Sequence, residues 1–264
     1  MSDESQTELD GGAEPLKEGT LLSHLVELRG RLLKIFAAVV VVFVALLPFI
    51  DIIFDFVSEP IRRALPGGAL VAIDVTSPVL TPLKLTFFVA LFAAMPVVLY
   101  QVWAFVAPGL YRQEKRFAIP LLGSSILLFY AGVAFAYLVV FPLIFNFFIS
   151  AAPANVEVQT DIARYLDFIT MIVLAFGLAF EVPVATVLVV WTGITTPQKL
   201  AAARPYVFLG AFVIGMLLTP PDVISQTLLA IPVYLLYEIG LFMSRAFARV
   251  KKTEESDEET PTAE

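Results

Sequence analysis

The chain contains no cysteine and only one histidine, His24. Without cysteine it can form no disulfide framework, no thiolate metal site and no cysteine nucleophile, and one histidine does not make a histidine-rich metal cluster. The sequence also lacks the glycine-rich phosphate loop and the dinucleotide-binding fingerprint. We therefore expect no metal centre and no nucleotide cofactor on this chain. Nucleotide bound to this chain is not the expected energy source, and nucleic acid is not an expected partner.

Charge is also scarce. Charged residues make up 16% of the chain and hydrophobic residues 59%, with a mean hydropathy of +0.86, whereas a soluble domain carries about 25% charged residues. This composition predicts an all-α, polytopic membrane protein whose single membrane domain covers residues 21–250. The net charge of −7 comes from two acidic tails, 1–20 and 251–264, which we expect to be disordered and solvated. The first tail lacks the pattern of a cleavable signal peptide.

Apolar segments long enough to approach a bilayer crossing recur six times. They lie at 34–56, 85–107, from 117 onward, 168–194, 205–218 and 223–243. The third segment has no charge until Glu157, so we expect its helix to protrude or bend. The fifth spans only about 21 Å, against a hydrocarbon core of about 30 Å. Segments five and six are therefore predicted to be short, either as a re-entrant hairpin or, preferably, as a hairpin that crosses by thinning the bilayer.

The distribution of Lys and Arg predicts the orientation. With six crossings, thirteen of the seventeen basic residues fall on the side that holds both termini. Basic residues concentrate in cytoplasmic loops. We therefore expect a multi-pass protein of the cytoplasmic (inner) membrane with cytoplasmic termini and with two long external loops, near 57–84 and 150–167.

Prolines lie inside five of these apolar stretches: Pro48, Pro96, Pro142, Pro183 and Pro232. Each removes a backbone hydrogen bond and tends to kink its helix. Several bent helices side by side would form a curved wall rather than a straight bundle. The alternative is that proline is simply commoner in membrane helices.

A single acidic residue, Glu181, lies at the centre of the 27-residue stretch 168–194, which holds no other charge. A charged group at this depth costs about 2.5–3.5 kcal/mol on insertion scales, so it usually marks a functional position. The plainer alternative is a protonated glutamate that hydrogen-bonds to a neighbouring helix and serves packing only.

Leucines at helical spacing predict an amphipathic helix on the cytoplasmic surface before the first crossing: Leu21, Leu25, Leu28 and Leu32. Glu27 and Arg31 lie on its opposite face, and their spacing by itself favours an intrahelical ion pair. By topology, Glu27 and Glu114 lie at the same membrane surface. Two carboxylates there could hold a pair of guanidinium groups, because arginine pairs with carboxylates in a bidentate manner.

Six motifs occur in order along the chain: His24-Leu25-x-Glu27-Leu28-Arg29-x-Arg31, Ser77-Pro78 with Pro82-x-Lys84, Tyr100-Gln101-x-Trp103-x-Phe105, Pro108-x-Leu110-Tyr111-x-x-Glu114, Phe180-Glu181-x-Pro183 and Thr219-Pro220-Pro221-Asp222. Together they closely resemble the TatC family, the multispanning receptor subunit of the twin-arginine protein translocase. The resemblance covers about residues 21–250 and leaves the acidic tails outside it.

The resemblance implies a concave, glove-like arrangement of helices with Glu181 facing the hollow. It implies a cytoplasmic site for the twin-arginine signal peptides of folded cargo proteins, formed by Glu27, Arg29, Phe105 and Glu114. Export would be driven by the proton gradient across the membrane, and the resemblance implies a translocase component that is not an enzyme and has no catalytic residues and no cofactor.

The resemblance also implies contacts with single-span TatB and TatA subunits around Met216, Thr219 and Gln226, in addition to membrane lipid and self-association in a larger complex. A glutamine at that depth should seek an interhelical partner. Pro60 matches an external-loop position on which the family relies, although alone it would indicate a turn. Asp222 is expected either to cap the sixth helix or to act in translocation.

Two other functions are compatible with parts of the pattern. A secondary transporter could use Glu181 as a proton relay, but no convincing internal repeat accompanies it. An intramembrane hydrolase would need paired acids, a serine with a base, or metal ligands at depth. Only Glu181 lies deep, since Asp51 and Asp55 approach the far interface and Glu238 lies toward the cytoplasmic end.

Overall fold

The computed structural model describes residues 18–64, 70–106, 115–151, 160–218 and 223–258. Nearly all of them are helical. The elements are α1 (Glu18–Leu46), the 3₁₀ turn η1 (Leu47–Phe49), α2 (Ile50–Ala64), β1 (Leu70–Val71), α3 (Ser77–Ala93), α4 (Met95–Val106), α5 (Lys115–Phe135), the π-helical turn η3 (Ala136–Val140), α6 (Phe141–Ala151), β2 (Thr160–Asp161), α7 (Ile162–Ala179), α8 (Val182–Trp191), α9 (Pro197–Ala202), α10 (Arg204–Leu218) and α11 (Val223–Glu258).

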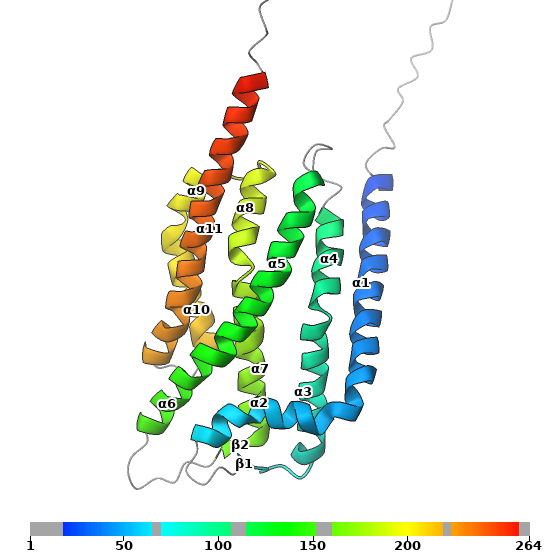
Figure 1. Cartoon of the computed structure of the whole chain (residues 1–264), viewed down its shortest axis with the longest axis vertical. Helices are drawn as coiled ribbons and strands as arrows, with labels where there is room; N and C mark the ends of the chain where they lie inside the picture. The colour runs from blue at the N-terminus through cyan, green and yellow to red at the C-terminus, as the bar shows by residue number, and fades with distance from the viewer. Residues whose placement is uncertain (1–17, 65–69, 107–114, 152–159, 219–222, 259–264) are drawn as a thin grey trace, which may run out of the picture.

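The long helices stand side by side as a wall (Figure 1). Helix α1 lies at one edge and packs on α3 and α4, while α10 and α11 pair at the opposite edge. The described chain begins and ends at the same end of the molecule, and α2 runs crosswise at the other end beside a two-residue parallel pairing of β1 with β2. This arrangement is the one that an even number of crossings produces.

Within the described residues, four helical stretches are long and apolar enough to cross a membrane: Leu25–Arg63, Ile119–Ala151, Ile162–Trp191 and Val223–Ala248. A fifth is the pair α3 and α4, which is bent by 49°. Helix α10, at 15 residues, is the short apolar helix expected for segment five. The all-α membrane fold is therefore as predicted, while the count of six crossings stays a prediction.

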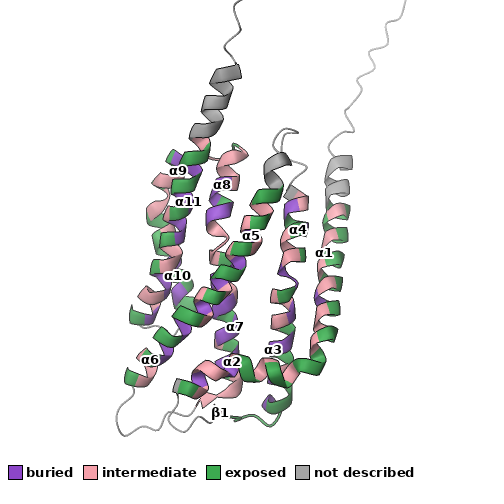
Figure 2. Cartoon of the chain, in the orientation of Figure 1, coloured by how far each residue is buried: buried purple, intermediate pink, exposed green. Residues whose placement is uncertain are grey.

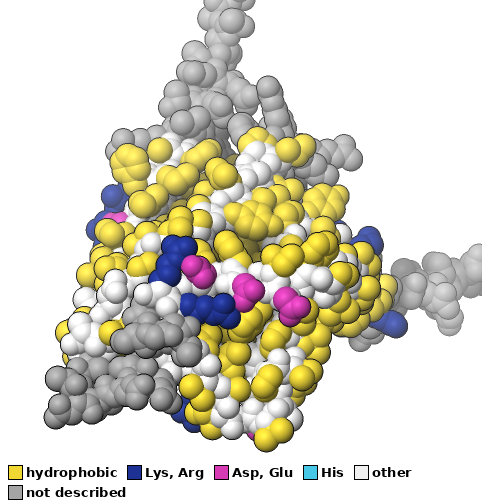
Figure 3. Space-filling model, turned by 60° about the horizontal axis from the view of Figure 1, so that its bottom comes forward, with side chains coloured by type: hydrophobic (Ala, Val, Ile, Leu, Met, Phe, Trp, Pro, Cys, Tyr) yellow, Lys and Arg dark blue, Asp and Glu magenta, His cyan; other side chains and the backbone are white. Residues whose placement is uncertain are grey.

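The first crossing ends earlier than we predicted. Helix α1 stops at Leu46, Pro48 lies in η1, and α2 then turns across the end of the wall (Figure 1). Residues 50–56 therefore belong to an amphipathic surface helix and not to the crossing. Asp51 and Asp55 are exposed, whereas Ser58 and Ile61 on the same helix are buried. Charged side chains form a row over the apolar surface at this end of the molecule (Figure 3).

Two other predicted boundaries are wrong for a shared reason. Helix α3 begins at Ser77 and α7 at Ile162, both before the starts that we placed after Lys84 and Asp167. These two charges lie on neighbouring helices, and Lys84 Nζ is 2.5 Å from Asp167 Oδ1. Because the charges pair with each other across the two helices, they do not terminate them.

The sixth segment is not short, contrary to our prediction. Helix α11 has 36 residues and continues to Glu258, into the stretch expected to be a tail. The residues after the apolar part are mostly charged, and the Arg, Lys and Glu among them are good helix formers. A fall in hydropathy therefore marks the end of the apolar part of this helix and not the end of the helix itself.

The long third segment is continuous from α5 through η3 to α6 and runs obliquely across the wall (Figure 1). The apolar stretch Ile119–Ala151 has 33 residues and spans roughly 50 Å, more than one bilayer core, as expected. The wide π-helical turn contains Leu138, whose carbonyl would ordinarily accept a hydrogen bond from residue 142. Pro142 has no amide hydrogen to donate, so the helix changes its register at this point.

The other prolines act in different ways. Pro96 lies just after the bend between α3 and α4, and Pro183 lies in the first turn of α8, directly after the break with α7. By contrast, α11 continues through Pro232. Proline therefore coincides with a local irregularity at Pro48, Pro96, Pro142 and Pro183, as a kinking role predicts. Pro232 fits the alternative that proline is simply common in membrane helices.

The buried residues gather along α7 and α8, whereas α1 is mostly exposed or half-buried (Figure 2). The core is formed where α7 meets α5, η3 and α6, around Phe141, Ile144, Ile172 and Phe176. This core fixes the position of the α7–α8 break, which carries Glu181.

Candidate functional site

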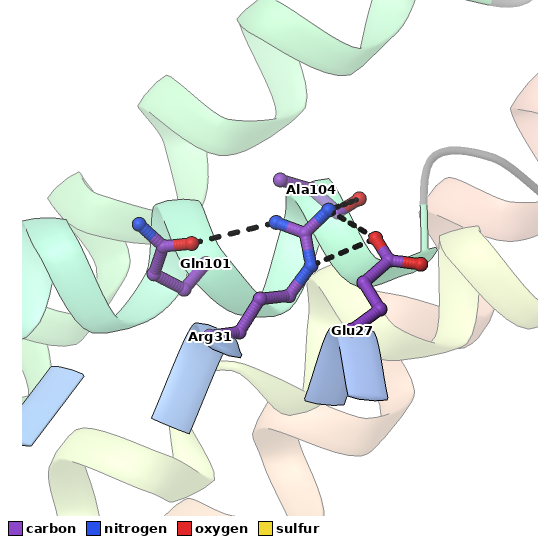
Figure 4. Close-up of polar contacts among 4 residues, drawn as sticks. All are labelled: Glu27, Arg31, Gln101 and Ala104. Carbon is purple, nitrogen blue, oxygen red and sulfur yellow. Dashed lines mark hydrogen bonds and ion pairs between the residues drawn. The ribbon is translucent and has the colours of Figure 1, made fainter. Parts of the chain in front are cut away.

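The ion pair between Glu27 and Arg31 lies on α1, and Arg31 also binds α4 (Figure 4). Arg31 Nε donates a hydrogen bond to Glu27 Oε1 at 3.0 Å, and Nη2 donates to the same oxygen at 2.5 Å. Nη2 also donates to the Ala104 carbonyl at 2.9 Å, and Nη1 to Gln101 Oε1 at 3.4 Å. The pair that the spacing favours is formed, and the same guanidinium also binds the neighbouring helix.

The two side chains differ in exposure. Arg31 is 19% exposed and Glu27 is 39% exposed. Both bonds from Arg31 end on Oε1 of Glu27, and the second carboxylate oxygen points away from the guanidinium (Figure 4). Glu27 therefore presents a partly accessible carboxylate whose other half already holds a guanidinium.

Of the other three residues expected at the signal-peptide site, the structure describes two. Arg29 is exposed on α1, and Phe105 is half-buried on α4, directly after Ala104. The contact between α1 and α4 thus brings Glu27 and Phe105 to the same region. Glu114 lies outside the described residues.

Glu181 lies at the break between α7 and α8 and is half-buried. The hydroxyl of Ser125, a buried residue of α5, donates a hydrogen bond to Glu181 Oε2. The other oxygen, Oε1, is buried and has no hydrogen-bond partner among the described residues. The carboxyl is therefore neither fully sealed between helices nor freely exposed. Sequence reasoning missed Ser125 because a serine in an apolar helix is common and 56 positions separate the two residues.

The residues expected to contact partner subunits lie near the α10–α11 turn. Gln226 donates from Nε2 to the Phe212 carbonyl of α10 at 3.0 Å, so its interhelical partner belongs to the same chain. Gly215 is buried against Gln226, and the adjacent Met216 is 49% exposed. Thr219 and Asp222 lie outside the described residues.

Pro60 lies inside α2, not in a turn as its sequence context alone indicated. Because proline has no amide hydrogen, the Phe56 carbonyl one turn earlier loses its helical donor. The hydroxyl of Tyr137 donates to that carbonyl at 2.8 Å and satisfies it. Pro60 also lines a groove of about 740 Å³ between α2 and the η3–α6 region, together with Glu59 and Asn146.

An ion pair between two helices stabilises the other edge of the wall. Arg204 of α10 donates to both carboxylate oxygens of Glu238 on α11, at 2.7 Å each. The hydroxyl of Tyr234 donates to the same carboxylate at 3.0 Å. Glu238 is therefore committed to holding α10 against α11. In the part of the chain that the structure describes, no three acidic, histidine or cysteine side chains gather as a metal site.

Comparison with known proteins places these features in context. Residues 23–232 match the family model described as Sec-independent protein translocase protein (TatC). The Sec-independent protein translocase protein TatC of Escherichia coli strain K12 is 58% identical over 228 residues, which are 86% of this chain and 88% of that protein. The protein of the same name from Azotobacter chroococcum mcd 1 is 57% identical over 236 residues, 89% of this chain and 91% of that protein.

Solved structures give the same result. A crystal structure described as twin arginine translocase receptor TatC superposes with a TM-score of 0.77 at 38% identity, covering 84% of this chain and 98% of that chain. A second structure of that receptor, in DDM, superposes with a TM-score of 0.78 at the same identity and covers 84% and 99% of the two chains.

Proposed function

This chain belongs to the TatC family of Sec-independent protein translocase proteins, and on that premise we propose that it is the signal-peptide receptor of a twin-arginine translocase. It is a membrane component of a protein translocase and not a member of a family of catalytic enzymes. In the proposed role it binds the signal peptides of folded proteins and takes part in their export across the cytoplasmic membrane, driven by the proton gradient.

The observation that carries this proposal is the environment of Glu27. Its carboxylate, 39% exposed, already accepts two hydrogen bonds from a guanidinium at 3.0 and 2.5 Å. A carboxylate that is placed to accept a forked pair of N–H groups has the chemistry needed to recognise arginine. Glu114, in the connection between α4 and α5, would supply the second carboxylate for the arginine pair.

After capture, the apolar part of the signal peptide would move along the wall toward Glu181. The half-buried carboxyl and its buried, unpartnered oxygen Oε1 provide a polar acceptor at membrane depth. A polar group of this kind is costly in an apolar surrounding, so its presence at this depth indicates a role in binding or transport.

We further propose that the single-span TatB and TatA subunits contact the α10–α11 edge near Met216, Thr219 and Gln226. The side chain of Met216 supports this assignment, because it is 49% exposed and so offers an apolar contact to a partner helix at this edge. In this proposal both termini are cytoplasmic, α2 with Pro60 lies on the external side, and several copies of the chain associate in the complete translocase.

A peptide-capture experiment tests the receptor role. A signal peptide with a photoreactive group beside its two arginines is crosslinked to the full-length protein in detergent, and the crosslinked fraction is measured for Glu27→Gln and Glu114→Gln. We expect each variant to lower the yield at least tenfold, because each removes a charged partner of a guanidinium.

Glu59→Gln is the matched control, because Glu59 forms the same kind of i,i+4 pair, with Arg63, on α2. It should leave the crosslinked fraction unchanged. Lipid vesicles that hold the peptide but no protein give the background of the measurement. An unchanged yield in both Glu27→Gln and Glu114→Gln would refute the capture step.

A further inference from the structure

We propose that Arg31 is a built-in competitor of the signal peptide. In the resting receptor its guanidinium occupies Glu27, and an arginine of the incoming peptide takes its place. This inference rests on the proposed role of Glu27 as a capture residue, and it assigns to Arg31 a function in setting the affinity of that site.

The geometry of the pair supports the assignment. Arg31 approaches Glu27 with the Nε and Nη2 edge of its guanidinium, and both donors end on Oε1. A peptide arginine would use the same edge for its pair of bonds to the carboxylate. Two guanidinium groups cannot both make these bonds to one oxygen. An arginine of the peptide can begin at the other oxygen, which points away from Arg31, but it must displace Arg31 from Oε1 to bind both oxygens (Figure 4).

The second set of contacts makes displacement feasible. When Glu27 is taken by another partner, Arg31 keeps the Ala104 carbonyl at 2.9 Å and the Gln101 side chain at 3.4 Å, both on α4. A guanidinium that is only 19% exposed would otherwise be left without acceptors, at a high energetic cost. The acceptors on α4 thus hold Arg31 while Glu27, the more exposed partner, exchanges.

Competition of this kind has a specific thermodynamic signature. Every cationic ligand that binds Glu27 must replace the same bonds from Arg31, so the competitor lowers the affinity of each ligand by the same factor. Arg31 therefore sets how tightly a signal peptide binds, and it leaves the preference for arginine over lysine to the ligand's own contacts.

The test uses the full-length protein in detergent, with dissociation constants measured by fluorescence anisotropy for a twin-arginine peptide and its twin-lysine analogue. For Arg31→Gln we expect both peptides to bind about fivefold tighter, the upper range for loss of a partly exposed ion pair, with an unchanged ratio of the two constants. Weaker or unchanged binding of both peptides would overturn the proposal and assign Arg31 to structure alone.

Arg31→Lys separates a forked competitor from simple charge repulsion. Lysine keeps the positive charge but cannot donate two hydrogen bonds in a fixed fork. We expect this variant to bind both peptides more tightly than the wild type. A wild-type affinity in Arg31→Lys would show that only the charge matters and would overturn the proposed exchange.

Two further variants keep the outcomes distinct. Arg63→Gln removes the corresponding partner of Glu59 on α2 and should leave both affinities unchanged. Glu27→Gln tests the premise: if it leaves peptide binding intact, the receptor role of Glu27 fails whatever Arg31 does. If Glu27→Gln abolishes binding while Arg31→Gln leaves it unchanged, the receptor role stands and the competitor is refuted.

Discussion

The contact between Glu181 and Ser125 joins a membrane-depth carboxyl to a buried hydroxyl on another helix. The sequence alone predicts that Glu181 is important, because an acid at the centre of a long apolar stretch is costly. It cannot predict Ser125, because that pairing depends on how α5 packs against the α7–α8 break. The Glu27–Arg31 pair could be predicted from its spacing, whereas its contacts with Gln101 and Ala104 depend on tertiary packing.

Removal of the Ser125 hydroxyl should destabilise the protein measurably. In Ser125→Ala, Glu181 loses its only described hydrogen-bond donor, and we expect the free energy of unfolding to fall by about 1–2 kcal/mol. Unfolding in a mixed-detergent titration measures this change. Ser124→Ala is the neighbouring control, because the Ser124 hydroxyl donates only to the Leu121 carbonyl of its own helix. Equal losses in both variants would contradict the role assigned to Ser125.

Pro60 and Tyr137 should be energetically coupled. Tyr137→Phe leaves the Phe56 carbonyl without a donor, which we expect to cost about 1 kcal/mol of unfolding free energy. In a Pro60→Ala background the alanine amide can supply that donor, so the same substitution should cost less. A double-mutant cycle measures the coupling. Tyr130→Phe, which removes a distant bond to the Phe92 carbonyl, should cost the same in both backgrounds, and a coupling of zero for Tyr137 would contradict this account.

Among the elements, the contact between α5 and α7 depends on two glycines. A Cβ atom at Gly132 would lie 2.5 Å from the Phe176 carbonyl oxygen, and one at Gly177 would lie 2.6 Å from the Phe129 ring. The backbone of α5 can therefore approach α7 closely only because these side chains are absent. The sequence predicts both helices from their hydropathy, but it does not reveal which of its glycines lie at a helix contact.

Gly132→Ala should separate packing from helix propensity. Alanine favours the helix by up to about 1 kcal/mol over glycine, yet the clash with the Phe176 carbonyl should make the net effect a loss of about 1–3 kcal/mol of unfolding free energy. Gly123→Ala, on the same helix with open space around it, should be neutral or stabilising. Thermal unfolding in detergent compares the two, and equal stability would show that α5 and α7 can separate without cost.

For the whole molecule, apolar segments and proline positions predict the all-α membrane fold well, because burial in lipid requires long helices. The errors lie in where the helices begin, turn and end. Paired charges such as Lys84 and Asp167 continue a helix, and the amphipathic α2 looks like part of a crossing because it directly follows α1. Neither pairing nor helix direction is encoded in hydropathy.

The absence of cysteine makes the expected orientation simple to test. Val75→Cys and Ile194→Cys place single thiols at opposite ends of the wall, at positions that are 93% and 76% exposed. With a membrane-impermeant maleimide, we expect Val75→Cys to be labelled in intact spheroplasts and Ile194→Cys only after lysis. The reverse pattern would place the termini outside the cytoplasm.

The wall-like arrangement of the helices also determines how much lipid surrounds the protein. A row of helices has a longer perimeter in the membrane plane than a closed bundle of the same helices, so more acyl chains lie directly against it. Helix α1, at the edge, contributes little to the interior and much to this perimeter. Chain length and saturation of the surrounding lipid should therefore affect the stability of this protein more strongly than that of a compact bundle of equal size.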